Sequence, residues 1–479
     1  MKHLEFTALA LAAKIKAGEC SVLELATATQ ETIKEKNGAI NAFITLATDA
    51  YTEKKATEVQ EKVANGETLS PLAGVPIAIK DNICTLGMKT TCASKMLENF
   101  TPPYSATVVK RLEDAGLLLA GKTNMDEFAM GASSKTSYFG AVKNPWNVAY
   151  VPSGSSGGSA AAVASGMVSC ALGSDTGGSV RQPAAFCGVT GFKPSYGLVS
   201  RYGAVAYASS LDQIGTITKD VADTAALLDI IAGHDPRDAT SLPNGPNNFL
   251  ENLSGDIQGK RIALPVAAID ANVDEEVKQA LQSAAEVLKS QGAIVEEIDM
   301  DCLDYAVHVY HILANAEASS NLARFDGIKY GYRTEQPESL EMLYKKTRTE
   351  AFGDEVIKRI LLGTLMLSSD CYESHYKKAM QVRNVIVAQM QAVFAKFDAI
   401  LLPVFPDTVP LLEEETKDDT GAYLADKFNV IANLAGLPAL SVPAGFDKKG
   451  LPIGVQIMGA RTCDQVVLNI GHALQMHTD

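Results

Sequence analysis

The apolar residues of the first 65 positions recur near helical spacing. Leu9 and Ala12, and later Leu25 and Ile33, stand between polar positions at intervals that place them on one helix face. A helix with such a stripe must bury it against another element. The pattern therefore predicts an N-terminal helical layer over about residues 1–65, packed on the remainder of the chain.

The pattern changes at about residue 72. From there to about residue 235, short apolar runs at 75–79, 117–120 and 168–172 alternate with helical segments and glycine-rich connections. Such alternation is typical of α/β proteins, in which helices cover the faces of a sheet. We therefore expect the segment 72–235 to hold the core of an α/β sheet.

The second half of the chain alternates between strands and helices on a larger scale. Residues 261–298 show a strand, a helix and a strand in succession, whereas residues 301–396 are almost wholly helical. Further strand patterns follow at 399–404, 439–442 and 453–457. The segment 301–396 is therefore predicted to be a helical insertion or subdomain over the α/β core.

The composition is that of a packed globular protein, because 47% of the 479 residues are hydrophobic and 20% are charged. With 42 Lys and Arg against 56 Asp and Glu, the net charge is 42 − 56 = −14, which argues against direct binding of nucleic acid by the average surface. The eight cysteines are scattered without a CxxC pair, and we expect no signal peptide or membrane helix. These features predict a cytoplasmic protein.

One segment departs strongly from ordinary composition. The 27 residues from Ser153 to Ser179 contain eight Ser and seven Gly but a single charge, Asp175. Two Gly/Ser blocks, 154–159 and 175–179, each stand where a loop should enter a helix, and successive amides without side chains can bind an anion. A flexible linker would not be followed directly by apolar helix and strand patterns. The segment is therefore predicted to supply hydroxyl groups and free backbone amides to a site.

An activated serine needs a base, and no histidine lies between His3 and His234. Lys80 is the natural alternative. It ends the apolar run 76–79, so its side chain can leave a buried strand where desolvation lowers the pKa of an ammonium group toward neutrality. A neutral lysine can accept a proton. The competing interpretation is a solvated surface lysine, against which the apolar flank argues.

Three other patterns predict different chemistry. Residues 116–123 formally satisfy the phosphate-loop rule GxxxxGK[ST], but their four middle residues read as an apolar strand and not as a turn. Residues 154–158 also fit the G-x-S-x-G elbow of α/β-hydrolases with Ser156 as nucleophile, yet poor strand material precedes them. His308 and His311 share a helix face without an evident third ligand. We therefore predict neither a nucleotide site nor a metal site, and we favour the lysine over the elbow.

The chain resembles the amidase signature family at three places: GSSGGS at 154–159, GSDTGGSVRQP at 173–183 and GVPIAIKDN at 74–82. The spacing of these segments is specific to that family. The resemblance implies a single large α/β domain over residues 1–479, with a central mixed β-sheet that helices cover on both faces and a Ser/Gly-rich catalytic core within 72–235.

The same resemblance implies a Ser-cisSer-Lys triad of Lys80, Ser155 and Ser179. Neutral Lys80 would draw a proton from Ser155 as Ser155 takes the proton of Ser179, which then attacks a carboxamide. A cis peptide bond is implied before Ser155. The oxyanion would be held by three backbone amides, those of Thr176, Gly177 and Gly178.

Within the family, the chain looks most like the glutamine-hydrolysing subunits of amidotransferases that act on Glu-tRNA(Gln) or Asp-tRNA(Asn). The segments 121–131, 209–215 and 321–327 carry this closer match. It implies a heterotrimer in which a B subunit binds the tRNA, uses ATP and Mg²⁺ and receives ammonia, together with a small C subunit. This chain would then hold no cofactor of its own. The alternatives are a stand-alone amidase for another carboxamide and a catalytically silent scaffold subunit.

Glutamine also presents an α-carboxylate and an α-ammonium group. The resemblance implies that Arg359 grips the carboxylate, that Asp426 pairs with the ammonium group and that Tyr310 lies beside them. From the residues alone, each of the three would read as a surface helix residue. The chain departs from the usual pattern where Ala132, Lys135 and Ser153 replace Ser, Glu and Gly, which concerns the wall of the site and not the triad.

Overall fold

A computed structural model of the protein describes residues 5–67, 69–243, 248–270, 272–413 and 425–477. Its strands are β1 (Phe43–Leu46), β2 (Pro76–Lys80), β3 (Leu118–Thr123), β4 (Cys170–Asp175), β5 (Thr190–Lys193), β6 (Gln213–Thr218), β7 (Arg261–Pro265), β8 (Ile294–Ile298), β9 (Ala399–Pro403), β10 (Ala439–Phe446) and β11 (Pro452–Gly459). Within the described residues they form one sheet in the order β1-β3-β2-β4-β6-β5-β10-β11-β9-β7-β8. β2 runs parallel to β3 and β4, whereas β4 and β6 are antiparallel. The sheet is therefore mixed, which confirms the predicted α/β fold class.

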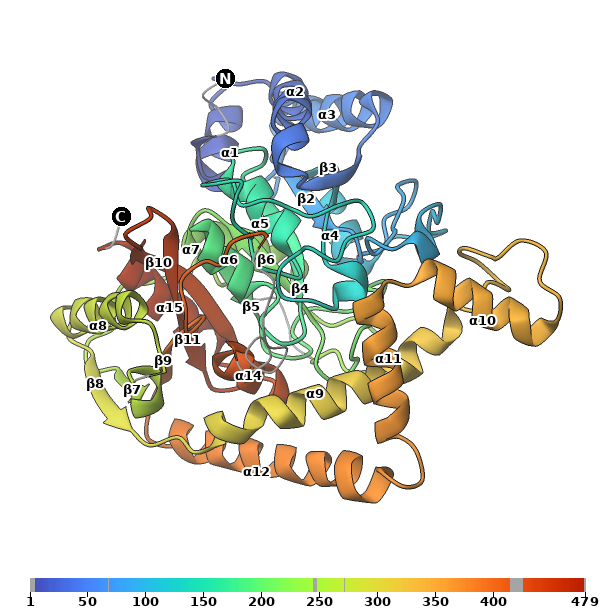
Figure 1. The fold of residues 1–479 in the computed structure, drawn as a ribbon. Helices are drawn as coiled ribbons and strands as arrows, with labels where there is room; N and C mark the ends of the chain where they lie inside the picture. The colour runs from blue at the N-terminus through green and yellow to red at the C-terminus, as the bar shows by residue number, and fades with distance from the viewer. Residues whose placement is uncertain (1–4, 68, 244–247, 271, 414–424, 478–479) are drawn as a thin grey trace.

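Helices cover both faces of this sheet (Figure 1). They are α1 (Ala8–Lys16), α2 (Val22–Ile40), α3 (Asp49–Ala64), α4 (Thr107–Asp114), α5 (Gly157–Ala164), α6 (Arg181–Cys187), α7 (Val221–Ile231), α8 (Glu275–Ser290), α9 (Cys302–Asn321), α10 (Leu340–Ala351), α11 (Asp354–Met366), α12 (Lys377–Phe394), α14 (Val430–Leu434) and α15 (Asp464–Gln475). Two short 3₁₀ turns also matter for the site, η3 (Glu127–Ala129) and η7 (Ala425–Phe428).

The alternation of side chains along β2 determines which face carries the chemistry. Ala78 packs in one apolar cluster with residues of α5 and α6. Ile77 and Ile79 belong to the larger cluster with residues of α4, α7 and α15. Because successive side chains of a strand point to opposite faces, Lys80 emerges on the same side as Ala78. The end of β2 therefore directs Lys80 toward the helices α5 and α6.

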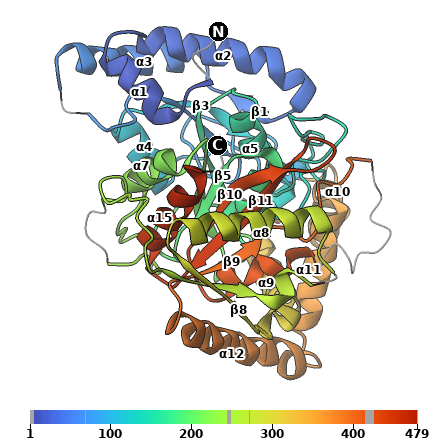
Figure 2. The ribbon, with the colours of Figure 1, turned by 90° about the vertical axis from the view of Figure 1, so that its left-hand side faces the viewer.

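The N-terminal helices α1, α2 and α3 lie together near β1 and β3 (Figure 2). A capping box starts α2, because Ser21 Oγ accepts from the amide of Glu24 and the Glu24 carboxylate accepts from the amide of Ser21. The prediction of helices alone over 1–65 missed β1, which pairs antiparallel with β3 at the edge of the sheet. Four residues are too few for a period of two to stand out between helical patterns.

The helices α9, α10, α11 and α12 occupy most of residues 301–396 and lie along one side of the molecule, away from α2 and α3 (Figure 1). α9 packs against both α11 and α12, and it also contacts α14 and η7. The helical segment thereby reaches the loop between β4 and α6, where Tyr310 of α9 lies against Gly177. Among the described residues, no helix combines the length and the apolarity that a membrane crossing requires.

Candidate active site

β2 places a lysine in a closed, polar site. Lys80 is the last residue of β2 and is fully buried. Its Nζ donates hydrogen bonds of 2.8 Å to Ser155 Oγ and to Ser156 Oγ, and one of 3.2 Å to the carbonyl oxygen of Ser174. The lysine and the middle serine predicted from the sequence are therefore in direct contact.

Burial lowers the pKa of Lys80 from its ordinary range to about 7. Three carboxylates oppose this shift, those of Asp126, Asp175 and Asp212. Because desolvation of the ammonium group outweighs their attraction, a large share of Lys80 is neutral near pH 7. A neutral amine has a lone pair that can accept the proton of a hydroxyl group bonded to it.

The backbone around Ser155 is held by a neighbouring loop. The peptide bond between Gly154 and Ser155 is cis. The carbonyl oxygen of Ser155 accepts a hydrogen bond of 3.2 Å from the amide of Asp126. A Cβ atom added to Gly154 would overlap the Asp126 carboxylate, so the close approach of the two loops requires glycine there. The loop of Asp126 thus holds the turn that carries Ser155, two residues before α5 begins.

Ser179 lies on the loop between β4 and α6, where 7% of its surface is exposed. The amide of Ser156 donates a hydrogen bond of 3.1 Å to the carbonyl oxygen of Ser179. This bond joins the two serine loops. Among the hydrogen bonds of the described residues, none connects the hydroxyl groups of Ser179 and Ser155. The structure therefore joins Lys80 to Ser155 directly, and Ser179 to that pair through the backbone of Ser156.

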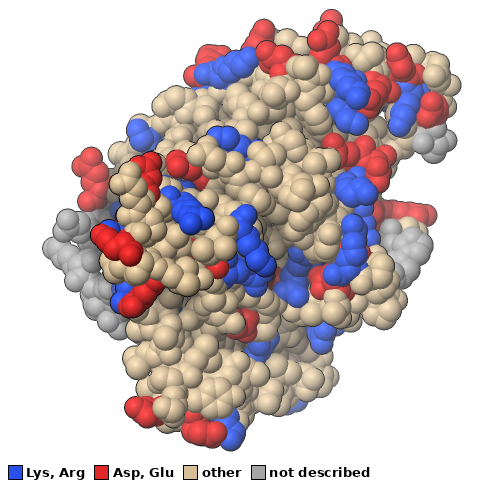
Figure 3. All heavy atoms as spheres, turned by 90° about the vertical axis from the view of Figure 1, so that its right-hand side faces the viewer, with Lys and Arg blue, Asp and Glu red and all other residues tan. Residues whose placement is uncertain are grey.

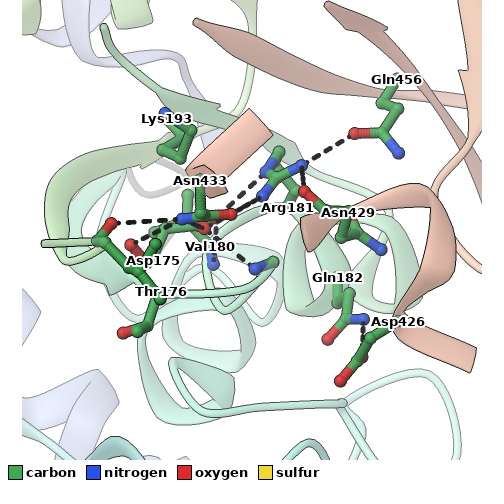
Figure 4. Close-up of polar contacts among 12 residues, drawn as sticks. Asp175, Thr176, Val180, Arg181, Gln182, Lys193, Asp426, Asn429, Asn433 and Gln456 are labelled. Atoms are coloured by element: carbon green, nitrogen blue, oxygen red, sulfur yellow. Dashed lines mark hydrogen bonds and ion pairs between the residues drawn. The ribbon is translucent and has the colours of Figure 1, made fainter. Parts of the chain in front are cut away.

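A buried ion pair shapes the loop that carries Ser179 (Figure 4). Asp175 accepts two hydrogen bonds of 3.0 Å from the guanidinium group of Arg181. The same carboxylate accepts hydrogen bonds from two backbone amides, that of Gly178 at 2.9 Å and that of Val180 at 3.2 Å. Burial alone would raise the pKa of Asp175, but the charge and hydrogen bonds of Arg181 hold it well below its usual range. The loop 176–180 is therefore wrapped around an ionised carboxylate.

The three predicted oxyanion donors are not equivalent in this loop. The hydrogen of the Gly178 amide is already bonded to Asp175. Thr176 is held by its side chain, whose hydroxyl group donates a hydrogen bond of 2.7 Å to Asp212 Oδ1. Gly177 packs closely on Tyr310, because a Cβ atom added to it would lie 2.6 Å from the Tyr310 hydroxyl oxygen. The loop can approach this ring only with glycine at position 177.

Arg359 and Tyr310 meet through a third residue. Arg359 of α11 is buried, and its Nη1 donates a hydrogen bond of 2.6 Å to the hydroxyl oxygen of Tyr207. Its Nε donates 2.7 Å to Glu355 Oε1. The hydroxyl groups of Tyr310 and Tyr207 are close enough for each to influence the pKa of the other, and burial raises the pKa of both. Tyr310 of α9 and Arg359 of α11 thus stand together beside Gly177.

Asp426 belongs to η7 and contacts the helix that follows the Ser179 loop. Its Oδ1 accepts a hydrogen bond of 2.7 Å from Gln182 Nε2, on the first turn of α6 (Figure 4). Burial raises the pKa of Asp426 to about 6, although the hydrogen bond from Gln182 and the charge of Arg359 oppose the shift. The structure therefore brings the three residues predicted for glutamine recognition into the surroundings of Ser179.

Two departures from the family pattern contact each other. Ser153 has a φ of 64°, in the left-handed region that favours glycine, which agrees with the glycine usual at this position. Its Oγ donates 3.1 Å to the carbonyl oxygen of Ala132, the second departure. Ala132 is exposed and Lys135 is half-buried. The contact lies on the loop before the cis peptide bond and leaves Lys80 and Ser155 in place.

The sequence patterns of a phosphate loop and of a nucleophile elbow lie in structural surroundings that differ from those motifs. Lys122, from the run that resembles a phosphate loop, is fully buried in β3. Its Nζ donates hydrogen bonds of 2.6 Å to the carbonyl oxygen of Ile83 and 2.8 Å to Thr90 Oγ1. Residues 144–152, before the elbow pattern, contain no strand beyond an isolated bridge at Tyr150. In the part of the chain that the structure describes, no three His, Cys, Asp or Glu side chains are grouped to hold a metal ion.

Four residues of the site were not predicted from the sequence to contribute: Ser156, Gln182, Tyr207 and Asp212. A local signal exists for two of them, because Ser156 follows the predicted serine and Gln182 stands three residues after Ser179, about one helical turn along the chain. Tyr207 reaches the site only through the tertiary fold, and no periodicity or motif marks it. Asp212 lies in the segment 209–215 that carries the closer family resemblance, but no role was predicted for it.

Comparison with known proteins places this geometry in a family. The Amidase family model matches residues 24–468. The chain is 53% identical to the A subunit of the glutamyl-tRNA(Gln) amidotransferase of Agathobacter rectalis, over 96% of this chain and 91% of that protein. It is 49% identical to the protein of the same name from Geobacillus thermodenitrificans, over 100% of this chain and 98% of that protein. The chain therefore belongs to the amidase signature family.

Solved structures agree with this assignment. The crystal structure of the glutamyl-tRNA(Gln) amidotransferase A subunit from Thermotoga maritima matches with a TM-score of 0.82 and 42% identity, over 99% of this chain and 95% of that one. A peptide amidase from Stenotrophomonas maltophilia matches with a TM-score of 0.84 and 28% identity, over 99% and 97% of the two chains. The shared fold thus serves amidases of more than one specificity.

Proposed function

We propose that this protein is the glutaminase subunit of a tRNA-dependent amidotransferase and hydrolyses glutamine to glutamate and ammonia. The observation that carries the proposal is the 2.8 Å contact of buried Lys80 with Ser155, next to the loop of Ser179. The presence of Arg359 and Asp426 near that loop supports glutamine as the substrate. The similarity over the whole chain to the A subunits of glutamyl-tRNA(Gln) amidotransferases supports the same choice.

The reaction begins with removal of a proton from Ser179. Neutral Lys80 takes the hydrogen of Ser155 Oγ, and Ser155 takes the hydrogen of Ser179, whose hydroxyl group turns toward Ser155 by rotation about its Cα–Cβ bond. Ser179 Oγ then forms a bond to the side-chain carboxamide carbon of glutamine, and the carbonyl electrons move onto the oxygen. Ser155 acts as a proton relay in this scheme, and Lys80 is the base.

The tetrahedral intermediate carries a negative oxygen that backbone amides can bind. We assign this role first to Thr176 and Gly177, because the Gly178 amide would have to share a hydrogen that Asp175 already accepts. Each such donor lowers the barrier by roughly 2.7–4 kcal/mol. One proton returns from Lys80 through Ser155 to the leaving nitrogen, the C–N bond breaks and ammonia departs.

Water completes the reaction at the glutamyl ester of Ser179. A water molecule gives a proton to the Ser155 and Lys80 relay as its oxygen attacks the ester carbon. The intermediate collapses with cleavage of the bond to Ser179 Oγ, which regains a proton from the same relay. Glutamate is released and Lys80 is neutral again, so the cycle consumes one water molecule for each glutamine.

Recognition of the amino-acid end of glutamine is assigned to side chains of the surrounding helices. Arg359 would bind the α-carboxylate, Asp426 the α-ammonium group, and Tyr310 would close the wall beside Gly177. A guanidinium group binds a carboxylate through two parallel hydrogen bonds, and its charge does not titrate near neutral pH. These interactions would select glutamine over simple carboxamides.

The transfer of ammonia requires partner subunits. We propose that a B subunit binds Glu-tRNA(Gln), activates it with ATP and Mg²⁺ and receives the ammonia, and that a small C subunit completes a heterotrimer. Lys122 is bonded inside β3, so the run 116–123 does not fit a phosphate group, and no step of ATP chemistry is assigned to this chain. Acidic and basic side chains are interspersed on the face seen in Figure 3, which together with the net charge of −14 supports little direct contact with tRNA.

The direct test is ammonia release from glutamine by the wild type and Ser179→Ala, each with and without the B and C subunits, ATP and Glu-tRNA(Gln). The proposal expects slow hydrolysis by the wild type alone, faster hydrolysis by the full set and none by Ser179→Ala. Full activity on another carboxamide without any partner, and none on glutamine, would show a stand-alone amidase. Partner-dependent assembly without hydrolysis of any amide would show a scaffold subunit.

A further inference from the structure

Gln182 connects the nucleophile loop to the acidic end of the glutamine site (Figure 4). It is buried, with 2% of its surface exposed, on the first turn of α6. Its backbone amide donates a hydrogen bond of 2.8 Å to the carbonyl oxygen of Gly178, so the residue is fixed to the loop of Ser179. Its side-chain Nε2 donates 2.7 Å to Asp426 Oδ1.

This hydrogen bond is the main support of the Asp426 carboxylate. Among the described residues, Gln182 is the only one that donates a hydrogen bond to this side chain. Several charged or titratable groups face the carboxylate: Arg359 of α11, Arg181 of α6, Asp175 of β4 and Tyr310 of α9. None of these four donates to it, so its orientation depends on Gln182 within the part of the chain described here.

The chemistry of position 182 suits a carboxylate that must bind a cation. An amide donor orients the carboxylate and favours its ionised form without adding charge. A lysine or arginine at this position would neutralise Asp426 and compete with an ammonium group. A glutamate would repel Asp426 or hold a proton against it. Glutamine thus leaves Asp426 Oδ2 oriented and the negative charge available to a ligand.

We propose that Gln182 is a positioning residue that holds Asp426 for the α-ammonium group of glutamine. This inference rests on the proposed glutaminase function. It assigns part of the selectivity of the site to the nucleophile helix α6 itself, because the residue that orients Asp426 stands three positions after Ser179. A substrate without an α-amino group would not use this support.

The test compares two substrates that differ only at that group. Gln182→Met keeps the length of the side chain and removes its hydrogen-bond donor. Glutamine and 4-carbamoylbutanoate, which has the same carboxylate and carboxamide but no amino group, are hydrolysed by the full-length chain with its partner subunits. We expect kcat/KM for glutamine to fall about tenfold, mainly through KM, and that for 4-carbamoylbutanoate to change less than about twofold.

A double-mutant cycle with Asp426→Asn completes the experiment. The inference expects Gln182→Met to add little further loss of glutamine activity in the Asp426→Asn background, since its effect passes through that carboxylate. Equal losses on both substrates, or additive losses in the cycle, would overturn the inference and make Gln182 a structural residue of α6. Failure of the proposed glutaminase function can be told apart from failure of this inference, because in that case the wild type itself would not hydrolyse glutamine.

Discussion

Glutamine hydrolysis should depend on pH in a way that reports the state of Lys80. The residue must lose its proton to act as a base, and burial lowers its pKa to about 7. The neutral fraction is then about one eleventh at pH 6, about one half at pH 7 and about ten elevenths at pH 8. At saturating glutamine, kcat should rise about tenfold from pH 6 to pH 8 and then level off. A lysine with the usual pKa of about 10.4 would give about a hundredfold rise and no plateau in this range.

The assay is ammonia release at constant ionic strength, measured for the wild type and two variants. Lys80→Ala should lose roughly 10²–10⁴-fold in kcat and show no acid limb. Asp126→Asn removes the charge that most opposes the lowered pKa of Lys80, so its acid limb should move to lower pH. A near wild-type rate with an unchanged acid limb in Lys80→Ala would refute the role of Lys80 as the base.

Two further changes test the surroundings of Ser179. Arg359→Ala should raise KM for glutamine roughly tenfold or more in steady-state kinetics, because a charge-assisted hydrogen-bond pair is lost, and an unchanged KM would reject the carboxylate assignment. Asp175→Asn should lower the free energy of unfolding by about 3–5 kcal/mol at pH 7, since it breaks a buried ion pair. Because the folded-state pKa of Asp175 is depressed, this stabilisation exists above the unfolded pKa of about 3.9 and is lost as pH falls through the folded value. Guanidinium unfolding of both proteins at pH 7 and pH 3 measures the difference in unfolding free energy, which should be smaller at pH 3, and equal stability at pH 7 would contradict the reasoning.

The strands that build the site could be predicted from local rules. β2 and β3 are buried along their whole length, and each therefore reads as an apolar run that ends near a lysine. The same rule predicted a strand at the middle of the run 116–123 in place of a phosphate-loop turn, and β3 begins at Leu118. The Ser/Gly blocks were correctly predicted to stand where loops enter helices, because α5 begins at Gly157, within the first block, and α6 at Arg181, two residues after the second.

The rest of the site depends on contacts that no local pattern encodes. Arg181 bonds the side chain of Asn433, which is 252 residues away, and Arg359 bonds Tyr207, which is 152 residues away. The bond from the Gly178 amide to the Asp175 carboxylate depends on the folded loop, so the sequence could not distinguish Gly178 from its neighbours as an oxyanion donor. The positions of Arg359 and Asp426 were expected from family resemblance and not from their spacing.

The central claim is that Ser179 attacks the carboxamide of glutamine, and trapping the acyl-enzyme tests it most directly. The full-length chain with its partners would be mixed with glutamine, quenched in acid within the first turnovers and digested for mass spectrometry. The account predicts a glutamyl ester on Ser179 that is absent in Ser179→Ala and much reduced in Lys80→Ala. A glutamyl adduct on Ser155 or Ser156 in place of Ser179, or hydrolysis that persists in Ser179→Ala, would contradict it.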